Sequence, residues 1–293
     1  MSLAVPAVTR HRRDPINSLM RIWGVLVYVF LFLPIAVIVA FSFNTGRVME
    51  SWTGFGFDGF TLAFNDENII DSVKTSLIAA VGSAILATVL GTFAGIAIVR
   101  RKGRWVPFFF ALVFLILVTP EIVDAIALLI WYVRIGGPFG PDNPIPVNFG
   151  LIRLWVGHSL FSAAVVTLIV RARLEGLDES LEEAAADLYA APVRRFTQIT
   201  LPLMLPAVLA AGLLSFSFSL DNTIISNFVN TAEASPWAVY VLSAVRSILR
   251  PELASMSTIL LLLTLFALGL VVLVLRRSGQ SGEEVAATLT GGG

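Results

Sequence analysis

The sequence predicts an all-α, polytopic membrane protein with six transmembrane helices. Of its 293 residues, 57% are hydrophobic and only 14% are charged, whereas soluble domains carry about 25% charged residues. The apolar residues gather in stretches of about 20 residues, the length that an α-helix needs to cross a bilayer. These stretches lack the alternating pattern of membrane β-barrels, and within a bilayer a helix satisfies its own backbone hydrogen bonds.

The apolar stretches follow one another along the chain, and each is long enough for one span. We expect no cleavable signal peptide, because the first stretch is too long and no small-residue cleavage site follows it. We place an N-terminal tail at 1–21, the membrane domain at 22–275 and a second tail at 276–293, which is rich in Gly, Ser and Thr from Ser278 and is expected to be disordered. The predicted spans are Ile22–Phe43, Ser76–Val99, Val106–Val133, Phe149–Val170, Leu203–Val229 and Ala254–Leu275.

The distribution of Arg and Lys predicts the orientation of these spans. Most of these residues lie in the N-terminal tail, in the connections after the second and fourth spans, and at the C-terminus. Lys and Arg favour the cytoplasmic side of a membrane. We therefore expect both termini and the 171–203 connection to be cytoplasmic.

The composition excludes several classes of protein and site. The chain has no cysteine and only two histidines, His11 and His158, which are far apart, so we expect no disulfide, no thiolate nucleophile and no metal site. Zero net charge and scarce lysine argue against nucleic-acid binding. No phosphate-binding G-x-x-x-x-G-K-[ST] loop occurs, so we expect no cofactor in this chain. For His158 we favour a hydrogen-bonded contact between helices over a proton or ligand site.

The connection at 171–203 carries strong helix signals. Asp178 or Ser180 can begin a helix, and the following glutamates suit its N-terminal dipole. Pro192 cannot continue that helix but suits the start of a second, short one that runs to Ile199. An apolar stripe on the first helix is too small to form its own core and therefore needs a partner. The stripe consists of Leu177, Leu181, Ala184, Ala185 and Leu188.

The same connection resembles the EAA signature of bacterial ABC-importer permeases. Glu183-Ala184-Ala185 and, at the family's spacing, Ile199, Leu201 and Pro202 carry this resemblance. It implies a type I ABC-importer permease fold in which the loop is a coupling helix that docks on a cytoplasmic ATPase. The residues implied in coupling are Glu182, Glu183, Ala184, Ala185, Asp187, Tyr189, Pro192, Ile199, Leu201 and Pro202.

Tyr189 departs from this signature, because the family has glycine at that position. Glycine adopts a left-handed turn freely, whereas tyrosine there costs about 1 kcal/mol. Two interpretations stay open: the turn is built differently in this chain, or Tyr189 packs against the ATPase.

Four further segments are similar to the permease of spermidine/putrescine importers. The resemblance implies half of a translocation path for a small cationic solute, a polyamine above all, in a bacterial inner membrane. It also implies a second homologous permease, two copies of an ATPase that bind ATP and Mg, and an extracytoplasmic solute-binding protein. The segments are Thr119–Leu129, Gly157–Phe161, Leu174–Leu188 and Ser217–Val229.

Three acidic residues lie within predicted spans. Glu121 and Asp124 fall near the middle of the third span, after Pro120, which can kink it. Asp221 falls well inside the fifth, beside Asn222, where the resembling family often has a second aspartate. A charge in a span costs several kcal/mol and usually faces a cavity or a partner. These four polar residues therefore either line a path for a cationic solute or pack against the second permease.

Two other functions stay open at this point. The chain could be an ABC permease for another small solute, such as a different cationic amine, an amino-acid-like compound or ferric ion. It could also be a secondary transporter or channel that works alone, driven by a proton on Glu121 or Asp124. Co-purification with an ATPase distinguishes a coupled permease from a lone transporter.

Overall fold

A computed structural model describes residues 15–101, 103–135, 149–178 and 180–277. The predicted tail at 276–293, apart from residues 276 and 277, and the first 14 residues lie outside this part of the chain. The described residues form helices, with only two isolated β-bridges and no strand. The helices are α1 Pro15–Phe41, α2 Asp58–Asn65, α3 Glu67–Arg100, α4 Trp105–Val118, α5 Glu121–Ile130, the π-helical turn η1 Trp131–Ile135, α6 Phe149–Glu175, α7 Ser180–Asp187, α8 Pro192–Arg195, the π-helical turn η2 Phe196–Thr200, α9 Leu201–Asp221, α10 Ile224–Val229, α11 Trp237–Val245 and α12 Pro251–Arg277.

The all-α prediction is confirmed, and the count of six spans is reached in a modified form. Five helices of the described chain are long and apolar enough to cross a membrane, and the bent pair α4 and α5 makes a sixth. Several helices run beyond the predicted limits. The second span begins earlier, at Glu67, because the Asp66 carboxylate caps α3 by accepting from the backbone N–H groups of Asn68 and Ile69.

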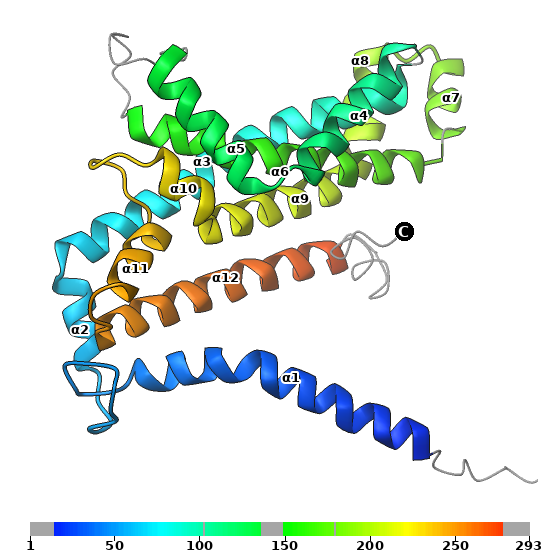
Figure 1. The fold of residues 1–293 in the computed structure, drawn as a ribbon. Helices are drawn as coiled ribbons and strands as arrows, with labels where there is room; N and C mark the ends of the chain where they lie inside the picture. The colour runs from blue at the N-terminus through cyan, green and yellow to red at the C-terminus, as the bar shows by residue number, and fades with distance from the viewer. Residues whose placement is uncertain (1–14, 102, 136–148, 179, 278–293) are drawn as a thin grey trace, which may run out of the picture.

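Three long helices, α3, α6 and α9, pack together as the central body (Figure 1). Small residues of α3 let α6 approach closely, as is common in membrane helix pairs. A Cβ atom on Gly91 would lie 2.6 Å from the side chain of Val166, and one on Gly95 would lie 2.8 Å from Val170. This body fixes the positions of the connections at both of its ends.

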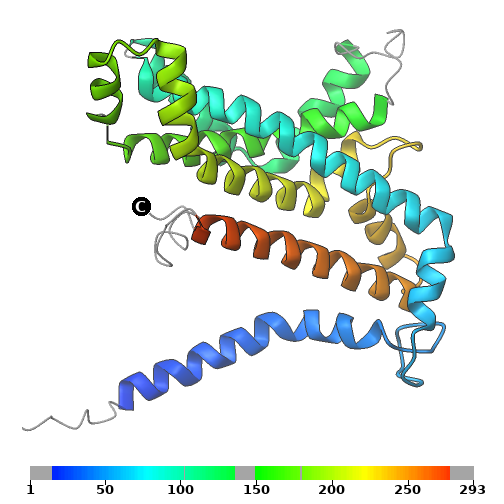
Figure 2. The ribbon, with the colours of Figure 1, turned by 180° about the vertical axis from the view of Figure 1, so that it is seen from behind.

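The first helix, α1, diverges from the rest of the chain. Figures 1 and 2 show it meeting α12 only near the ends that face α2. There the Ser255 hydroxyl of α12 donates to the backbone carbonyl of Ser42 at 2.8 Å. Along its apolar window α1 is not buried by any other described part of the chain. Its apolar surface is therefore left uncovered by the helices that the structure describes.

The third predicted span, Val106–Val133, is interrupted at Pro120, the residue that was expected to kink it. Helices α4 and α5 meet at an angle of 101°. Pro120 has no N–H to continue α4 and forces an extended conformation on Thr119, whose ψ is 129°. Glu121 and Asp124 consequently lie in the first turn of α5, directly after the break in the middle of this bent span.

The fifth predicted span, Leu203–Val229, is interrupted as well. Helix α9 ends at Asp221 and α10 begins at Ile224. Asn222 is extended, and its side-chain oxygen accepts from the backbone N–H groups of Ile225 at 3.0 Å and Ser226 at 3.4 Å. Asp221 therefore lies at the end of a helix, and the prediction that it lies well inside a span was wrong.

The second short helix expected at Pro192–Ile199 begins as predicted but does not end there. It continues from α8 through the π-helical turn η2 into α9, so that Pro192–Asp221 forms one span-length helix. The π-helical register starts a new hydrogen-bonding pattern just before Pro202, which has no N–H to donate. Ile199, Leu201 and Pro202 thus lie on the helix that leads into the membrane domain.

Candidate functional site

The loop between α6 and α9 presents a short helix, α7, at one end of the molecule (Figure 1). Of the two predicted starting residues, Asp178 accepts the backbone N–H of Ser180 at 2.9 Å. This hydrogen bond lowers the pKa of the Asp178 carboxyl. None of the residues of α7 is buried, so the helix has no core of its own, as expected from its length.

The end of α7 is a left-handed turn at Tyr189, whose φ is +58°. The N–H of Tyr189 donates to the carbonyl of Ala186 at 2.9 Å, and that of Ala190 donates to the carbonyl of Ala185 at 3.0 Å. These two bonds are those of a Schellman motif, in which glycine normally occupies the left-handed position. Tyr189 therefore makes the same turn that glycine would make, and the alternative of a differently built turn was wrong.

Apolar side chains around this turn point away from the molecule. Tyr189 is 97% exposed, Leu188 is 82% exposed and Val193 is 74% exposed. Of the predicted apolar stripe, Leu177 packs against the α3, α6 and α9 core, whereas Leu181 and Leu188 do not. An apolar surface of this kind, next to the exposed carboxylates of Glu183 and Asp187, is suited to contact another protein.

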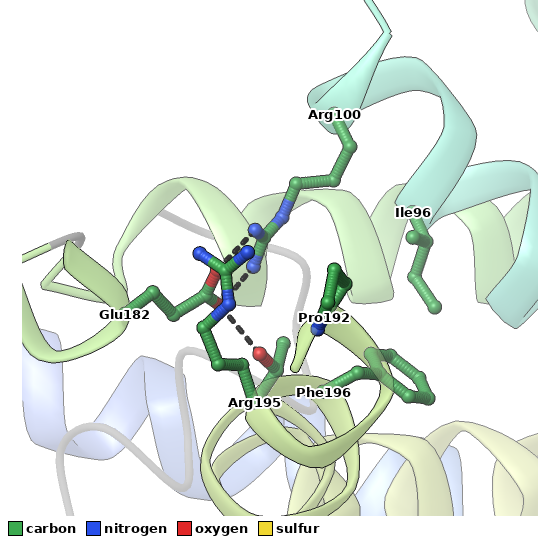
Figure 3. A pocket seen from close by; sticks show the side chains of 7 residues that line it. Ile96, Arg100, Glu182, Pro192, Arg195 and Phe196 are labelled. Atoms are coloured by element: carbon green, nitrogen blue, oxygen red, sulfur yellow. Dashed lines mark hydrogen bonds and ion pairs between the residues drawn. The ribbon is translucent and has the colours of Figure 1, made fainter. Parts of the chain in front are cut away.

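The opposite side of α7 is attached to the membrane helices through Glu182. Its two carboxylate oxygens accept from both terminal nitrogens of the Arg100 guanidinium, at the end of α3. One of them also accepts from the hydroxyl of Thr200, in η2. Figure 3 shows this arrangement beside a pocket of about 200 Å³. The pocket is lined by Ile96, Arg100, Glu182, Pro192, Arg195, Phe196 and Thr200.

These contacts keep Glu182 ionised. The hydrogen bonds from Arg100 are the largest cause that lowers its pKa, and the hydrogen bond from Thr200 and the charges of Arg100 and Arg195 act in the same direction. Partial burial acts against them. The pKa falls to about 2 as a result. Glu182 and Glu183, which are neighbours in sequence, therefore differ in role: the first is engaged within the chain, and the second is exposed.

The predicted solute-path residues lie where the two interrupted spans meet. The side-chain amide of Asn222 donates to the carboxylate of Glu121, which begins α5. Helices α5 and α10 pack against each other at this point. Asp124 follows Glu121 by one turn of α5, and Asp221 precedes Asn222. Within the described chain, the carboxylates of Asp124 and Asp221 have no hydrogen-bond or ion-pair partner.

His158 of α6 lies beside the same break and is 2% exposed. Its Nδ1 lies 2.6 Å from the Ser219 hydroxyl of α9, and its Nε2 lies 2.9 Å from the Ser226 hydroxyl of α10. The imidazole thus connects both sides of the break at Asn222. The preference for a hydrogen-bonded helix contact is confirmed.

Sequence reasoning missed two groups of contact residues. The sequence analysis used Arg100 only as one of the positive charges that predict orientation. Nothing in the sequence indicated that Arg100, and not its neighbour Arg101, would pair with Glu182. Ser219 and Ser226 are spaced seven residues apart along the chain, which in one continuous helix would place both on one face. The polar character of this stretch was the available signal, but the break that lets one histidine reach both was not visible.

The chain matches a known protein family over most of its length. The family described as binding-protein-dependent transport system inner membrane component matches residues 87–278. Over 244 residues the chain is 32% identical to the putrescine transport system permease protein PotI of Escherichia coli (strain K12), covering 82% of this chain and 85% of that protein. Over 241 residues it is 34% identical to the spermidine/putrescine transport system permease protein PotC of the same strain, covering 82% and 87%.

The fold is similar to that of a chain in a bacterial alginate ABC transporter, solved in complex with an alginate pentasaccharide-bound periplasmic protein. The TM-score is 0.69, the sequence identity is 16%, and the match covers 92% of this chain and 97% of that one. At this identity the likeness concerns the fold alone.

Proposed function

Because the chain belongs to the family of binding-protein-dependent transport system inner membrane components, we propose that it forms half of a translocation path for a small cationic solute, and that this solute is a polyamine. The chain is a permease subunit of an ABC importer, a transport subunit and not an enzyme. The names of its relatives, which specify putrescine and spermidine, support the choice of solute class.

The observation that best supports a cationic solute is the position of the acidic residues at the meeting point of two interrupted helices. Glu121 begins α5 and contacts Asn222, and Asp124 and Asp221 lie next to this contact without partners in the described chain. Interrupted membrane helices commonly form solute sites, because their free ends supply polar groups. Carboxylates there replace part of the hydration that a cation loses on entering the membrane.

Transport in this proposal is driven by two copies of a cytoplasmic ATPase, which bind ATP and Mg. The exposed apolar turn around Leu188, Tyr189 and Val193 supports docking at this end of the molecule. We propose that this turn and both termini lie in the cytoplasm, as the distribution of Arg and Lys predicts. A solute-binding protein would deliver the solute on the opposite side of the inner membrane.

A second homologous permease completes the path in this proposal. The apolar surface of α1, which the other described helices leave unburied, supports contact with that subunit and with lipid. A solute path between two permeases would also explain why Asp124 and Asp221 find no partner among the residues that the structure describes.

Reconstitution in liposomes tests this function. The chain, its second permease, the ATPase and the solute-binding protein are assembled together, and uptake of radiolabelled putrescine is measured with and without internal ATP. We expect putrescine uptake to require ATP. Unlabelled spermidine should suppress this uptake, whereas a neutral amino acid or ferric ion should not. Uptake by this chain without the ATPase would instead identify a lone transporter. ATP-driven uptake of other solutes but not of amines would reject the proposal that the solute is a polyamine.

A further inference from the structure

Among the described residues, one side chain of helix α7 forms hydrogen bonds to the membrane helices. None of its residues is buried, and its packing contacts are with α8 and η2, which continue its own loop. Within the described chain, Glu182 makes the only side-chain hydrogen bonds from α7 to another helix. The position of α7 relative to α3 therefore depends on this carboxylate.

The contact is more rigid than an ordinary surface ion pair. A single exposed pair contributes little, because its long side chains move and solvent screens it. Here two parallel hydrogen bonds from Arg100 reach the two oxygens of Glu182, a geometry that fixes direction as well as distance. The third bond comes from Thr200, which is buried at 2% exposure.

The three contact residues belong to three separate parts of the chain. Arg100 ends α3, Thr200 leads into α9, and Glu182 lies on the helix whose exposed turn is proposed to meet the ATPase. Helices α3 and α9 pack on each other and on α6. Glu182 thus connects α7 to both span-forming helices through one carboxylate.

We propose that Glu182 is a positioning residue that transmits the movement of α7 to α3 and α9 through Arg100 and Thr200, while the docking contact itself is made by the exposed turn. This inference rests on the proposed function. It separates two properties that the loop combines: binding of the ATPase, and conversion of ATPase movement into movement of the spans.

The test compares Glu182→Gln with the wild type in the full complex in liposomes. Solute uptake and ATP hydrolysis are measured in the same sample, and retention of the ATPase is measured by co-purification. We expect uptake per ATP hydrolysed to fall about tenfold, within the usual range of coupling between sites, while the ATPase stays bound. Two controls should leave the ratio unchanged: Arg101→Glu, at the exposed neighbour of Arg100, and Glu175→Gln, which removes the Arg171–Glu175 pair within α6.

Restoration of the link provides the second measurement. The exchange Arg100→Glu with Glu182→Arg should recover most of the coupling that either single change removes. Because the chain has no cysteine, Arg100→Cys with Glu182→Cys can also be joined by a reducible thiol crosslinker of about the length of the lost side chains. We expect coupling with the crosslink in place and its loss after reduction.

Three results would overturn the transmitting role, and a fourth would overturn the proposed function on which it rests. An unchanged ratio in Glu182→Gln, or no recovery by either the exchange or the crosslink, overturns the transmitting role. Loss of the ATPase from Glu182→Gln overturns it as well, because Glu182 would then belong to the docking contact. A wild-type complex without ATP-driven uptake overturns the proposed function itself, before any variant is compared.

Discussion

The side-chain amide of Asn222 donates to the carboxylate of Glu121 across the junction of two interrupted helices. The oxygen of the same amide accepts from the first N–H groups of α10. One side chain thus begins α10 and fixes the start of α5. Aspartate, which the resembling family often has here, could cap α10 but could not donate to Glu121. Asparagine in place of aspartate at position 222 therefore removes one negative charge and supplies the N–H donor that binds Glu121.

We predict that Asn222→Asp destabilises the protein. The change keeps the shape and the cap of α10, but it places two carboxylates together and leaves Glu121 without its donor. We expect a loss of about 1–3 kcal/mol, the usual cost of a lost partner for a buried polar group, seen as a lower unfolding temperature in detergent. Asn227→Asp, at an exposed position of α10, is the matched control. Equal unfolding temperatures for the two variants would contradict the role given to the Asn222 amide.

Neutralising the acids at the same junction should affect uptake more than assembly. In Glu121→Gln and Asp221→Asn the shape is nearly constant and only charge is removed. Losing one charge-assisted contact to a dication costs about 1.5–3 kcal/mol, or at least about tenfold in uptake. The measurement is radiolabelled putrescine uptake at matched expression, with ATPase co-purification as the control. Wild-type uptake in both variants would favour helix packing over a solute path.

The sequence was sufficient for the elements whose signals are local. Hydropathy over about 20 residues located the spans, and Pro120 marked the first break. The break at Asn222 has no proline, and Leu203–Val229 as a whole is long and apolar enough to be taken for one span, although serines, Asp221 and Thr223 lie close to the break. It exists because the Asn222 side chain caps α10 and because His158, from a different helix, bonds both sides. Contacts between distant segments cannot be obtained from periodicity.

The coupling loop was predictable in outline for the same reason. Its helix signals and its EAA spacing are local, and they placed α7 and the turn at Tyr189 correctly. The different positions of Glu182 and Glu183 depend on how α7 is rotated against α3, which only the folded chain determines. Arg100 and Arg101 at the end of α3 cannot be told apart from the sequence either. In the folded chain Arg100 is paired with Glu182, and Arg101 is exposed.

The ion pair of Glu182 predicts a specific pH dependence of stability. Its pKa is lowered from an ordinary value of 4.5 to about 2 in the folded chain, so the ionised form stabilises the fold above pH 4.5, and that contribution is lost as the pH falls toward 2. We expect the free energy of unfolding of the wild type to exceed that of Glu182→Gln by about 1–2 kcal/mol at neutral pH. The difference should stay constant from neutral pH down to about 5.5 and shrink in more acidic buffer.

Thermal unfolding of both proteins in detergent across this pH range is the measurement. The difference between the two proteins is used, because other carboxylates titrate equally in each. Glu175→Gln, which removes a pair within one helix, serves as the control and should differ little from the wild type at every pH. If the stability difference between the wild type and Glu182→Gln increased on acidification, the prediction would be wrong, because a carboxylate with a lowered pKa stabilises the fold less as the pH falls.

Charge reversal at the exposed neighbour should act on docking. Glu183→Lys changes an exposed side chain, so the fold and its unfolding temperature should be unchanged. We expect weaker retention of the ATPase, and a loss of uptake in proportion, because a reversed charge in a contact surface repels the groups that the original attracted. Normal co-purification together with normal uptake would remove Glu183 from the docking surface.

Tyr189 combines a strained backbone with an exposed ring, and three substitutions separate the two properties. Glycine removes both the strain and the ring, alanine keeps the left-handed strain but removes the ring, and phenylalanine keeps both. Because Tyr189 already makes the turn that glycine would make, with φ at +58° and its ring 97% exposed, the turn alone gives no reason for tyrosine. An exposed aromatic ring contributes large contact area at low entropic cost, as protein interfaces commonly use.

We therefore predict that Tyr189→Gly and Tyr189→Ala both reduce ATPase stimulation by the loaded solute-binding protein, and that Tyr189→Phe retains it. Stability should follow a different order. The glycine variant should be about 1 kcal/mol more stable than the alanine variant, because only glycine adopts the left-handed conformation without strain. Stimulation is measured with the reconstituted complex, and stability by thermal unfolding of the permease. If glycine stimulates as well as tyrosine while alanine fails, the turn matters and the ring does not, and the anchoring role of Tyr189 is rejected.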